Sequence, residues 1–145
     1  MIKIKFPKQQ VQVRQREGVN EIFEKKKKKW LRLSPEEWVR QHMIHYLLLK
    51  KYPASLIAIE KEIKLGELKK RCDIVVYTRQ ASPFMIIECK EMNVPLSQKT
   101  LEQILRYHIT LPADYLIVTN GSYCYGFHKI ETQFTETNEF PDYEG

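Results

Sequence analysis

The sequence predicts a mixed α/β fold in which helices flank a central mixed β-sheet, with elements in the order αβββαββ. Three observations support this prediction. The pattern Ser34-Pro35-Glu36-Glu37 is typical of a helix start, apolar runs of strand length follow it, and Asn120-Gly121 is a strong hairpin signal. A chain of 145 residues, 43% of them hydrophobic, is long enough for one domain with one buried core.

The first helix begins with Ser34 as N-cap and Pro35 at the first helical position, with a glutamate three residues after the cap. It runs to about Lys51 and ends before Pro53, because the residue before a proline disfavours helix. The later elements are expected in chain order: strands near 57–64, 72–78 and 84–90, with the turn Lys64-Leu65-Gly66-Glu67 between the first two, a helix near 98–110, and strands near 114–119 and 123–128 joined by Asn120-Gly121.

Charged segments lie on both sides of this core. Residues 1–29 combine a short alternating stretch, residues 2–6, with polar sequence, and are expected to form a strand followed by an arm. The lysine run 25–29 fits either salt-sensitive contacts with phosphates or a solvated arm. Residues 131–145 carry five acids and no Lys or Arg, and are expected to be a loose tail. The predicted organisation is therefore 1–33 basic arm and strand, 34–130 core domain and 131–145 acidic tail.

Composition excludes several classes. The formal net charge is +6 and the isoelectric point is about 9.2. No apolar run approaches the ~20 residues of a membrane span, and the first residues lack the apolar stretch of a signal peptide, so a cytoplasmic protein without a membrane partner is expected. Three scattered cysteines fit reduced thiols better than disulfides or a zinc site.

Two carboxylates and a lysine are associated with neighbouring apolar strands. Asp73 heads the run 72–77, and Glu88-Cys89-Lys90 closes the run 84–87. Because side chains alternate across a strand, Glu88 and Lys90 point to one face and Cys89 to the other. Carboxylates are the oxygen ligands that a hard divalent cation prefers, and such a cation activates water and polarises a phosphodiester. A lysine on the same face can orient that water or stabilise the charge of the transition state.

The same residues also allow a structural interpretation. Charged residues are common at strand ends, and a Glu-Lys pair two apart can be a surface ion pair worth roughly 0–1 kcal/mol. The hydrophobic context favours the catalytic interpretation, because ionisable groups seldom border buried strands without partners.

The helices offer further candidates. Glu36 shares a face with the apolar positions expected to pack on the core, whereas Glu37 is placed to return to Ser34 in a capping box, so Glu36 is the preferred third acid and Glu37 the alternative. Both also fit simple first-turn acids favoured by the helix dipole. Gln103 and Tyr107, four apart, lie next to each other on the second helix; a capping box with Thr100 and a core position are their structural alternatives.

Asp73, the triplet Glu88-Cys89-Lys90 and Gln103-x-x-x-Tyr107 together resemble the PD-(D/E)XK nuclease superfamily, in the branch at the amino terminus of type I restriction enzyme R subunits. The resemblance covers roughly residues 34–128 and also includes the segments 36–40, 59–60 and 116–121. It departs from the family at Cys72, where a proline is usual, and at Cys89, a position that offers only its backbone carbonyl to metal in the family.

The resemblance implies a restriction-endonuclease-like fold and a Mg²⁺-dependent DNA endonuclease, with Mn²⁺ as the alternative cation. It implies metal binding by Asp73, Glu88, the carbonyl of Cys89 and Glu36, with Lys90 acting at the attacking water. Gln103 and Tyr107 are expected to position the DNA backbone or to brace Lys90.

Expected partners are DNA and either a motor or specificity subunit or a second copy of the chain. Because these residues contain no phosphate loop of an ATP-driven motor, the chain is expected to be a free-standing nuclease-like protein or a fragment. The main alternative is a DNA-binding or assembly module with a nuclease fold and no turnover. A more distant alternative is a small structural protein whose acids only solubilise the sheet edge.

Overall fold

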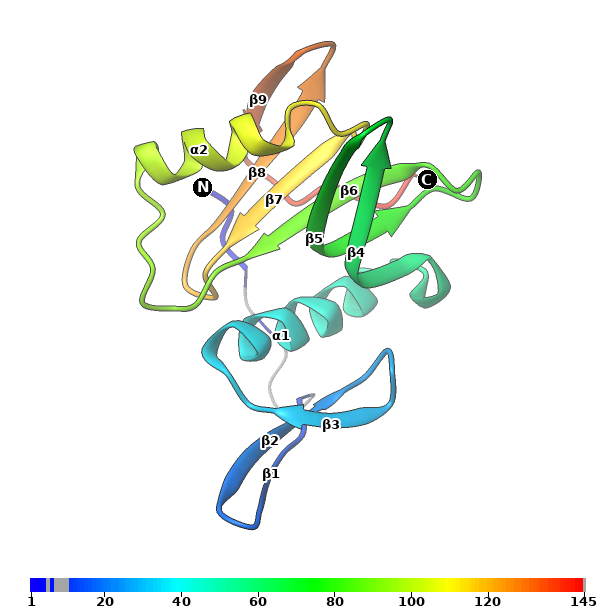
Figure 1. The fold of residues 1–145 in the computed structure, drawn as a ribbon. Coiled ribbons are helices and arrows are strands. Elements are labelled where there is room, and N and C mark those ends of the chain that lie inside the picture. Colours follow the sequence, from blue (N-terminus) through cyan, green and yellow to red (C-terminus); the bar gives the residue numbers. More distant parts are fainter. Residues whose placement is uncertain (5, 7–10, 145) are drawn as a thin grey trace.

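The computed structural model describes residues 1–4, 6 and 11–144, and these residues form a mixed α/β fold that confirms the predicted class (Figure 1). From α1 to β8 the order is the predicted αβββαββ. The helical elements of the described part are α1 (Pro35–Leu49), the short 3-10 helix η1 (Ala54–Leu56) and α2 (Gln98–His108). The strands are β1 (Val13–Arg16), β2 (Val19–Glu24), β3 (Lys29–Arg32), β4 (Ile57–Leu65), β5 (Leu68–Tyr77), β6 (Pro83–Cys89), β7 (Tyr115–Thr119), β8 (Cys124–Ile130) and β9 (Gln133–Thr137).

Strands β4 to β9 form a large mixed sheet in sequence order. Neighbouring strands are antiparallel except β6 and β7, which are parallel. Two parallel strands need a crossover connection, and here α2 supplies it. The carboxyl ends of β6 and β7 therefore lie together, where the backbone N–H of Lys90 donates to the carbonyl of Thr119 at 2.8 Å.

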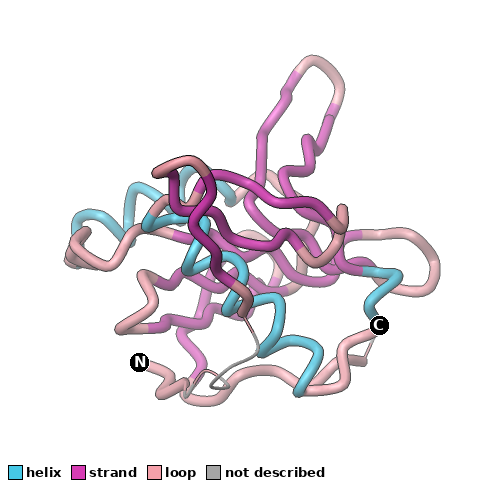
Figure 2. Tube along the Cα trace, turned by 90° about the horizontal axis from the view of Figure 1, so that it is seen from below, coloured by secondary structure: helices cyan, strands magenta, loops and turns pink. Residues whose placement is uncertain are grey.

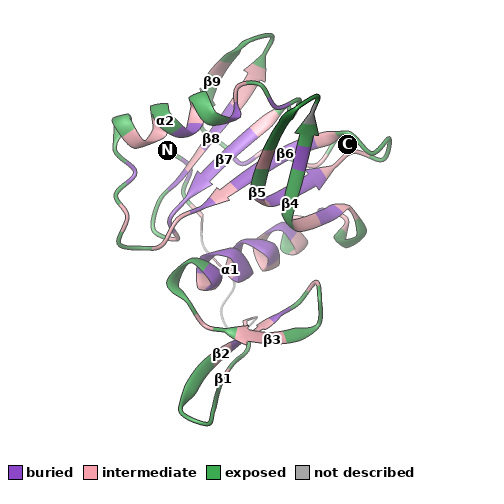
Figure 3. Ribbon diagram, viewed as in Figure 1, coloured by how far each residue is buried: buried purple, intermediate pink, exposed green. Residues whose placement is uncertain are grey.

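The two long helices cover opposite faces of this sheet. Buried side chains of α1, among them Val39, Met43 and Leu47, belong to one apolar cluster with Ile74 and Ile87. In the other cluster, Ile104 of α2 packs on the opposite face of the sheet, with Val75, Ile86, Leu116 and Val118 of the strands. Figure 3 shows α1 largely buried between neighbouring elements and α2 with an exposed outer face. Neither helix of the described chain is long and apolar enough to span a membrane.

Both helix starts follow from their capping residues. In α1 the Ser34 hydroxyl accepts a hydrogen bond from the backbone N–H of Glu37 at 3.1 Å, and Pro35 occupies the first turn, as predicted. In α2 the Ser97 hydroxyl accepts from the backbone N–H of Thr100 at 3.2 Å. Serine oxygens thus satisfy donors that a helix start would otherwise leave without a partner.

The prediction of a basic arm is wrong for residues 13–32, which fold into a small antiparallel sheet in the order β1-β2-β3. The lysine run lies at the turn between β2 and β3 and continues into β3. This small sheet, drawn in blue in Figure 1, lies on the side of α1 that faces away from the large sheet. Figure 2 shows the molecule from that side.

The loose tail predicted over 131–145 is also wrong for its first half. Residues 133–137 form β9, which pairs with β8, and Phe140 is buried against α1; Gly145 lies outside the described residues. At the other terminus, the predicted strand 2–6 includes Lys5, which the structure does not describe. Ile2 is buried and forms an isolated bridge with Cys124 at the start of β8.

Candidate active site

The hairpin of β4 and β5 changes the direction of its side chains at Glu60 and Asp73. Ile59 packs in the cluster under α1 and Ile63 in the cluster under α2, although their spacing in a regular strand would place them on one face. Glu60 has a positive φ of 48°, uncommon for a residue with a side chain. Asp73 therefore lies where β5 passes from one apolar core to the other, and its carboxylate meets polar groups.

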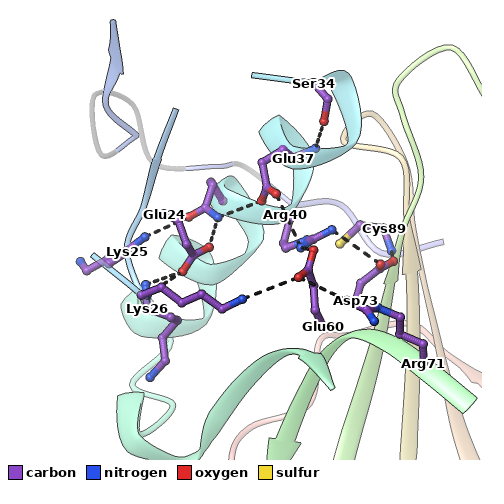
Figure 4. A network of polar contacts seen from close by, with 12 residues as sticks. Glu24, Lys25, Lys26, Ser34, Glu37, Arg40, Glu60, Arg71, Asp73 and Cys89 are labelled. Carbon is purple, nitrogen blue, oxygen red and sulfur yellow. Dashed lines mark hydrogen bonds and ion pairs between the residues drawn. The ribbon is translucent and has the colours of Figure 1, made fainter. Parts of the chain in front are cut away.

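Asp73 is joined directly to the end of β6. Its Oδ2 accepts a hydrogen bond of 2.7 Å from the backbone N–H of Cys89, and its Oδ1 lies 3.9 Å from a guanidinium nitrogen of Arg40 (Figure 4). Burial, and next the charge of Glu88, raise the pKa of Asp73 to about 6 against the opposing effects of Cys89 and Arg40. Asp73 and Glu88 thus form a pair of interacting carboxylates, as the sequence predicted.

Glu88 and Lys90 lie together on the α2 side. The Lys90 Nζ is 3.4 Å from Oε1 of Glu88, and Nε2 of His108 is 3.5 Å from Oε2. Burial raises the pKa of Glu88, but His108 and Lys90 outweigh it, so the pKa lies below its ordinary value. Cys89 is buried on the opposite face, as alternation predicted, and burial raises the pKa of its thiol well above the ordinary value.

A pocket of about 250 Å³ opens beside this pair. It is lined by Glu88, Lys90 and four α2 residues, namely Gln103, Ile104, Tyr107 and His108. Gln103 and Tyr107 thus reach the same pocket as the carboxylate and lysine. The N-cap of α2 is Ser97 and not Thr100, so Gln103 does not close the alternative capping box with Thr100. Tyr107 is 46% exposed, which excludes a core position; Lys70 lies over its ring at 4.1 Å and donates to its carbonyl.

The first turn of α1 differs from the expectation. Glu37, not Glu36, is buried: its carboxylate accepts from Gln41 at 3.0 Å and lies 3.6 Å from Arg40, while only its backbone N–H bonds Ser34. Glu36 is exposed, although Val39, Met43 and Leu47, which were expected to share its face, are buried as predicted. Its charge still contributes to raising the pKa of Asp73, so Glu36 is close enough to interact with the site.

Two site residues were missed by the sequence reasoning. Arg40 is 7% exposed and lies among Glu37, Glu60 and Asp73, with the shortest contact, 2.9 Å, to Glu60. Burial lowers its pKa, but the surrounding carboxylates outweigh burial and raise it. His108 is 2% exposed, and neither ring nitrogen has a hydrogen-bond partner among the described residues. In the sequence, the signal for each residue was a single ionisable side chain among apolar helix positions: Arg40 on α1 and His108 on α2.

The donor set suits a hard cation that keeps part of its water shell. Asp73 and Glu88 supply carboxylate oxygens, and the repulsion that raises the pKa of Asp73 is the interaction that a divalent cation would offset. In the described part of the chain no three His, Cys, Asp or Glu side chains gather into a complete ligand set. Mg²⁺ fits such an open site, since it is commonly held by one or two carboxylates with waters completing its shell.

Comparison with protein families gives one finding. The model of a family described as the type I restriction enzyme R protein N terminus matches residues 35–141. This match confirms the predicted R-subunit branch and includes Asp73, the Glu88-Cys89-Lys90 triplet and both helices. The small sheet precedes it. A comparison with curated proteins found no match.

Proposed function

The chain belongs to the family of type I restriction enzyme R protein N termini, and from this membership we propose that it is a metal-dependent DNA endonuclease of the PD-(D/E)XK type. One observation carries the proposal. The carboxylate of Asp73 is hydrogen-bonded to the backbone of Cys89, and this bond joins it to the strand end that presents Glu88 and Lys90. A carboxylate pair beside a lysine is the donor set that metal-assisted phosphodiester hydrolysis requires.

Asp73 and Glu88 would hold Mg²⁺, with Mn²⁺ as the alternative, and the Cys89 carbonyl and Glu36 are further candidate ligands. When bound, the cation lowers the pKa of a water and polarises the scissile phosphate. Arg40 limits the net charge around Asp73 from the α1 side, since its guanidinium also interacts with Glu37 and Glu60.

The pocket beside α2 supplies the remaining groups. Lys90 is partly exposed and can donate to a phosphate oxygen or to the attacking water, which stabilises negative charge as it develops. The Gln103 amide and the Tyr107 phenol line the same pocket and can donate to neighbouring backbone phosphates. His108, whose Nε2 lies 3.5 Å from Oε2 of Glu88, can orient that carboxylate. Each polar side chain of the pocket thus has a role in binding or orienting the substrate or the metal ligand.

The family description also bears on partners. Because it names the R protein of a restriction enzyme, we propose that the domain acts on DNA together with other subunits or with a second copy of itself. A non-catalytic DNA-binding or assembly module is the alternative. One observation favours it: Arg40 lies 3.9 Å from Asp73, so a protein cation already compensates part of the carboxylate charge.

Calorimetric titration with Mg²⁺ and Mn²⁺, combined with plasmid nicking in the same samples, tests the proposal. Asp73→Asn keeps the side-chain shape and removes the charge, and Asp142→Asn, an 85% exposed aspartate in the carboxyl-terminal segment, is the matched control. We expect wild type and control to bind cation and nick DNA, and Asp73→Asn to do neither. A wild type that binds no cation and matches Asp73→Asn would establish the non-catalytic alternative.

A further inference from the structure

The lysine run is held in a fixed turn by one buried carboxylate. Glu24, at the end of β2, is completely buried, and its Oε1 accepts hydrogen bonds from the backbone N–H groups of Lys26 at 2.5 Å and Lys27 at 3.1 Å. The other oxygen of Glu24 accepts from the side-chain amide of Gln41 on α1. The turn is therefore a built element of the fold rather than a solvated arm.

Gln41 continues this connection toward the candidate active site. Its amide nitrogen also donates to Glu37 at 3.0 Å, and its oxygen accepts from the backbone N–H of Lys25 at 3.4 Å. Glu37 in turn lies beside Arg40, which contacts Asp73 (Figure 4). A continuous set of polar contacts thus fixes the position of the lysine turn relative to the carboxylate pair.

The turn also reaches the β4–β5 hairpin through one shared carboxylate. Oε2 of Glu60 lies 3.7 Å from Nζ of Lys27 and 3.4 Å from the guanidinium of Arg71, while Oε1 binds Arg40. Lys27 and Arg71 are 45% and 69% exposed, so both side chains remain accessible to solvent. Two exposed cations, one from the turn and one from β5, therefore meet at Glu60.

Further lysines extend this charge along the hairpin. Lys64 and Lys69 are exposed and lie directly opposite each other in the β4–β5 register. Glu62 and Arg71 form another such pair, which is closer to Asp73. Alternation places all four on the face away from α2, because Ile63, between Glu62 and Lys64, and Cys72, next to Arg71, pack in the α2 cluster. Like charges directly opposite on a sheet are destabilising. Glu62, whose Oε1 lies 3.8 Å from Nζ of Lys64, offsets part of this repulsion, and a bound polyanion would offset the remainder.

We infer that Lys25, Lys27 and Lys28 of the turn, with Lys64, Lys69 and Arg71 of the hairpin, form a basic band that binds the phosphates of duplex DNA on the α1 side of Asp73. The inference rests on the proposed function, since the band positions the strand cleaved at the carboxylate pair. It adds an element outside the family match, because the turn precedes residue 35.

The composition of the band selects this partner. Lysine is depleted in protein–protein interfaces, where aromatic residues are enriched, whereas lysines contact phosphates without regard to sequence. Stacking on single-stranded bases needs free aromatic faces. Trp30, which follows the turn, already packs against Phe23 and against the guanidinium of Arg14 at 4.1 Å. Duplex backbone therefore fits better than a protein surface or a single strand.

Salt-dependent DNA binding tests the band. Two double variants, Lys27→Gln/Lys28→Gln and Lys64→Gln/Lys69→Gln, each remove two charges from the band. The control is Lys50→Gln/Arg79→Gln, which removes two charges outside the band, just after the ends of α1 and β5. Binding to a short DNA duplex is followed by fluorescence anisotropy in EDTA over a range of salt. Each phosphate that the protein neutralises adds ~0.9 to the slope of log K against log salt. We therefore expect this slope to fall by about 2 in each band variant and to stay unchanged in the control.

Two further measurements separate this inference from the proposed function. Metal titration and hydrolysis of bis(p-nitrophenyl) phosphate, a minimal diester too small to reach the band, are expected to be the same in the band variants as in wild type. Unchanged slopes in both band variants would overturn the inference even if the protein cleaves DNA. Equal or tighter binding of an RNA duplex or of single-stranded DNA would also overturn it. If the slopes fall in the band variants but the protein binds no metal, the basic band is supported and the proposed nuclease activity is excluded.

Discussion

The charge of Asp73 opposes folding at neutral pH when no cation is bound. Its pKa is raised from 3.8 to about 6 in the folded protein, so the folded state binds this proton more tightly than the unfolded state. The stabilisation that this bound proton contributes is therefore complete below about pH 4 and is lost as the pH rises through 6. A shift of this size corresponds to roughly 3 kcal/mol.

Asp73→Asn should consequently stabilise the metal-free protein at pH 8 by up to about 3 kcal/mol. At pH 4 it should have little effect. Urea unfolding in EDTA at the two pH values measures this difference. Asp142→Asn serves as the control, because that side chain is 85% exposed. A destabilised Asp73→Asn protein at pH 8 would mean that its contacts with Arg40 and Cys89 outweigh burial and the repulsion from Glu88.

His108 is a buried site residue whose part in metal binding can be tested by substitution. Because it lies 3.5 Å from Glu88 and helps to lower the pKa of that carboxyl, His108→Leu removes a contact of Glu88 and should lower the free energy of unfolding by roughly 1–3 kcal/mol. Glu88 would lose its neighbour at 3.5 Å, and groups that orient a metal ligand typically contribute ~10–100-fold to affinity. Calorimetry should therefore detect weaker Mg²⁺ binding. Unchanged affinity would assign His108 to packing alone.

At the scale of elements, the small sheet depends on Glu24. Glu24→Ala removes the acceptor for two turn N–H groups and for the Gln41 amide, which should lower the free energy of unfolding by roughly 2–4 kcal/mol. The control is Glu21→Ala on the same strand: Glu21 pairs with the part-exposed Arg14, a contact worth about 1 kcal/mol or less. Urea unfolding followed by tryptophan fluorescence, to which Trp30 of β3 and Trp38 of α1 contribute, compares the two variants. Equal effects would show that Glu24 does not anchor the turn.

The elements predicted from sequence are those with strong local signals. Ser34 and Pro35 specified the start of α1, and Asn120 specifies the hairpin of β7 and β8, since its Oδ1 accepts from two loop N–H groups. The small sheet was missed because its turn consists of lysines, whose fixed conformation depends on the contact of Glu24 with Gln41, 17 positions further along the sequence. β9 was missed because it has one aromatic residue, Phe134, among polar ones.

The candidate site was predicted for residues on strands and less well for residues on helices. Alternation along β6 correctly separated Glu88 and Lys90 from Cys89. On α1 the expected apolar face is buried, but in the first turn the buried acid is Glu37, whose carboxylate contacts Gln41 and Arg40, and apolar periodicity does not encode these polar contacts. Arg40 and Glu60 come together only through the change of side-chain direction at Glu60, and no periodicity in the sequence contains that irregularity.

At the scale of the whole molecule, the carboxylate pair connects the two helical layers. Asp73 contacts Arg40 of α1, and Glu88 contacts His108 of α2 on the opposite face of the sheet. One cation held by both carboxylates would therefore stabilise both layers at once. At a free concentration 100 times its dissociation constant, a ligand stabilises the fold by about 2.7 kcal/mol. In a domain of this size that is roughly 5–10 °C in Tm.

We expect Mg²⁺ to raise the Tm of wild type by this amount and to leave Asp73→Asn, Glu88→Gln and the double variant unchanged. The two single substitutions should be fully non-additive, because each removes a ligand of the same ion. Thermal unfolding by circular dichroism at matched Mg²⁺ concentrations measures the four shifts, with Asp142→Asn as the control. If each single variant kept half of the wild-type shift, the carboxylates would bind separate ions, and the connection between the two helical layers would not pass through the metal.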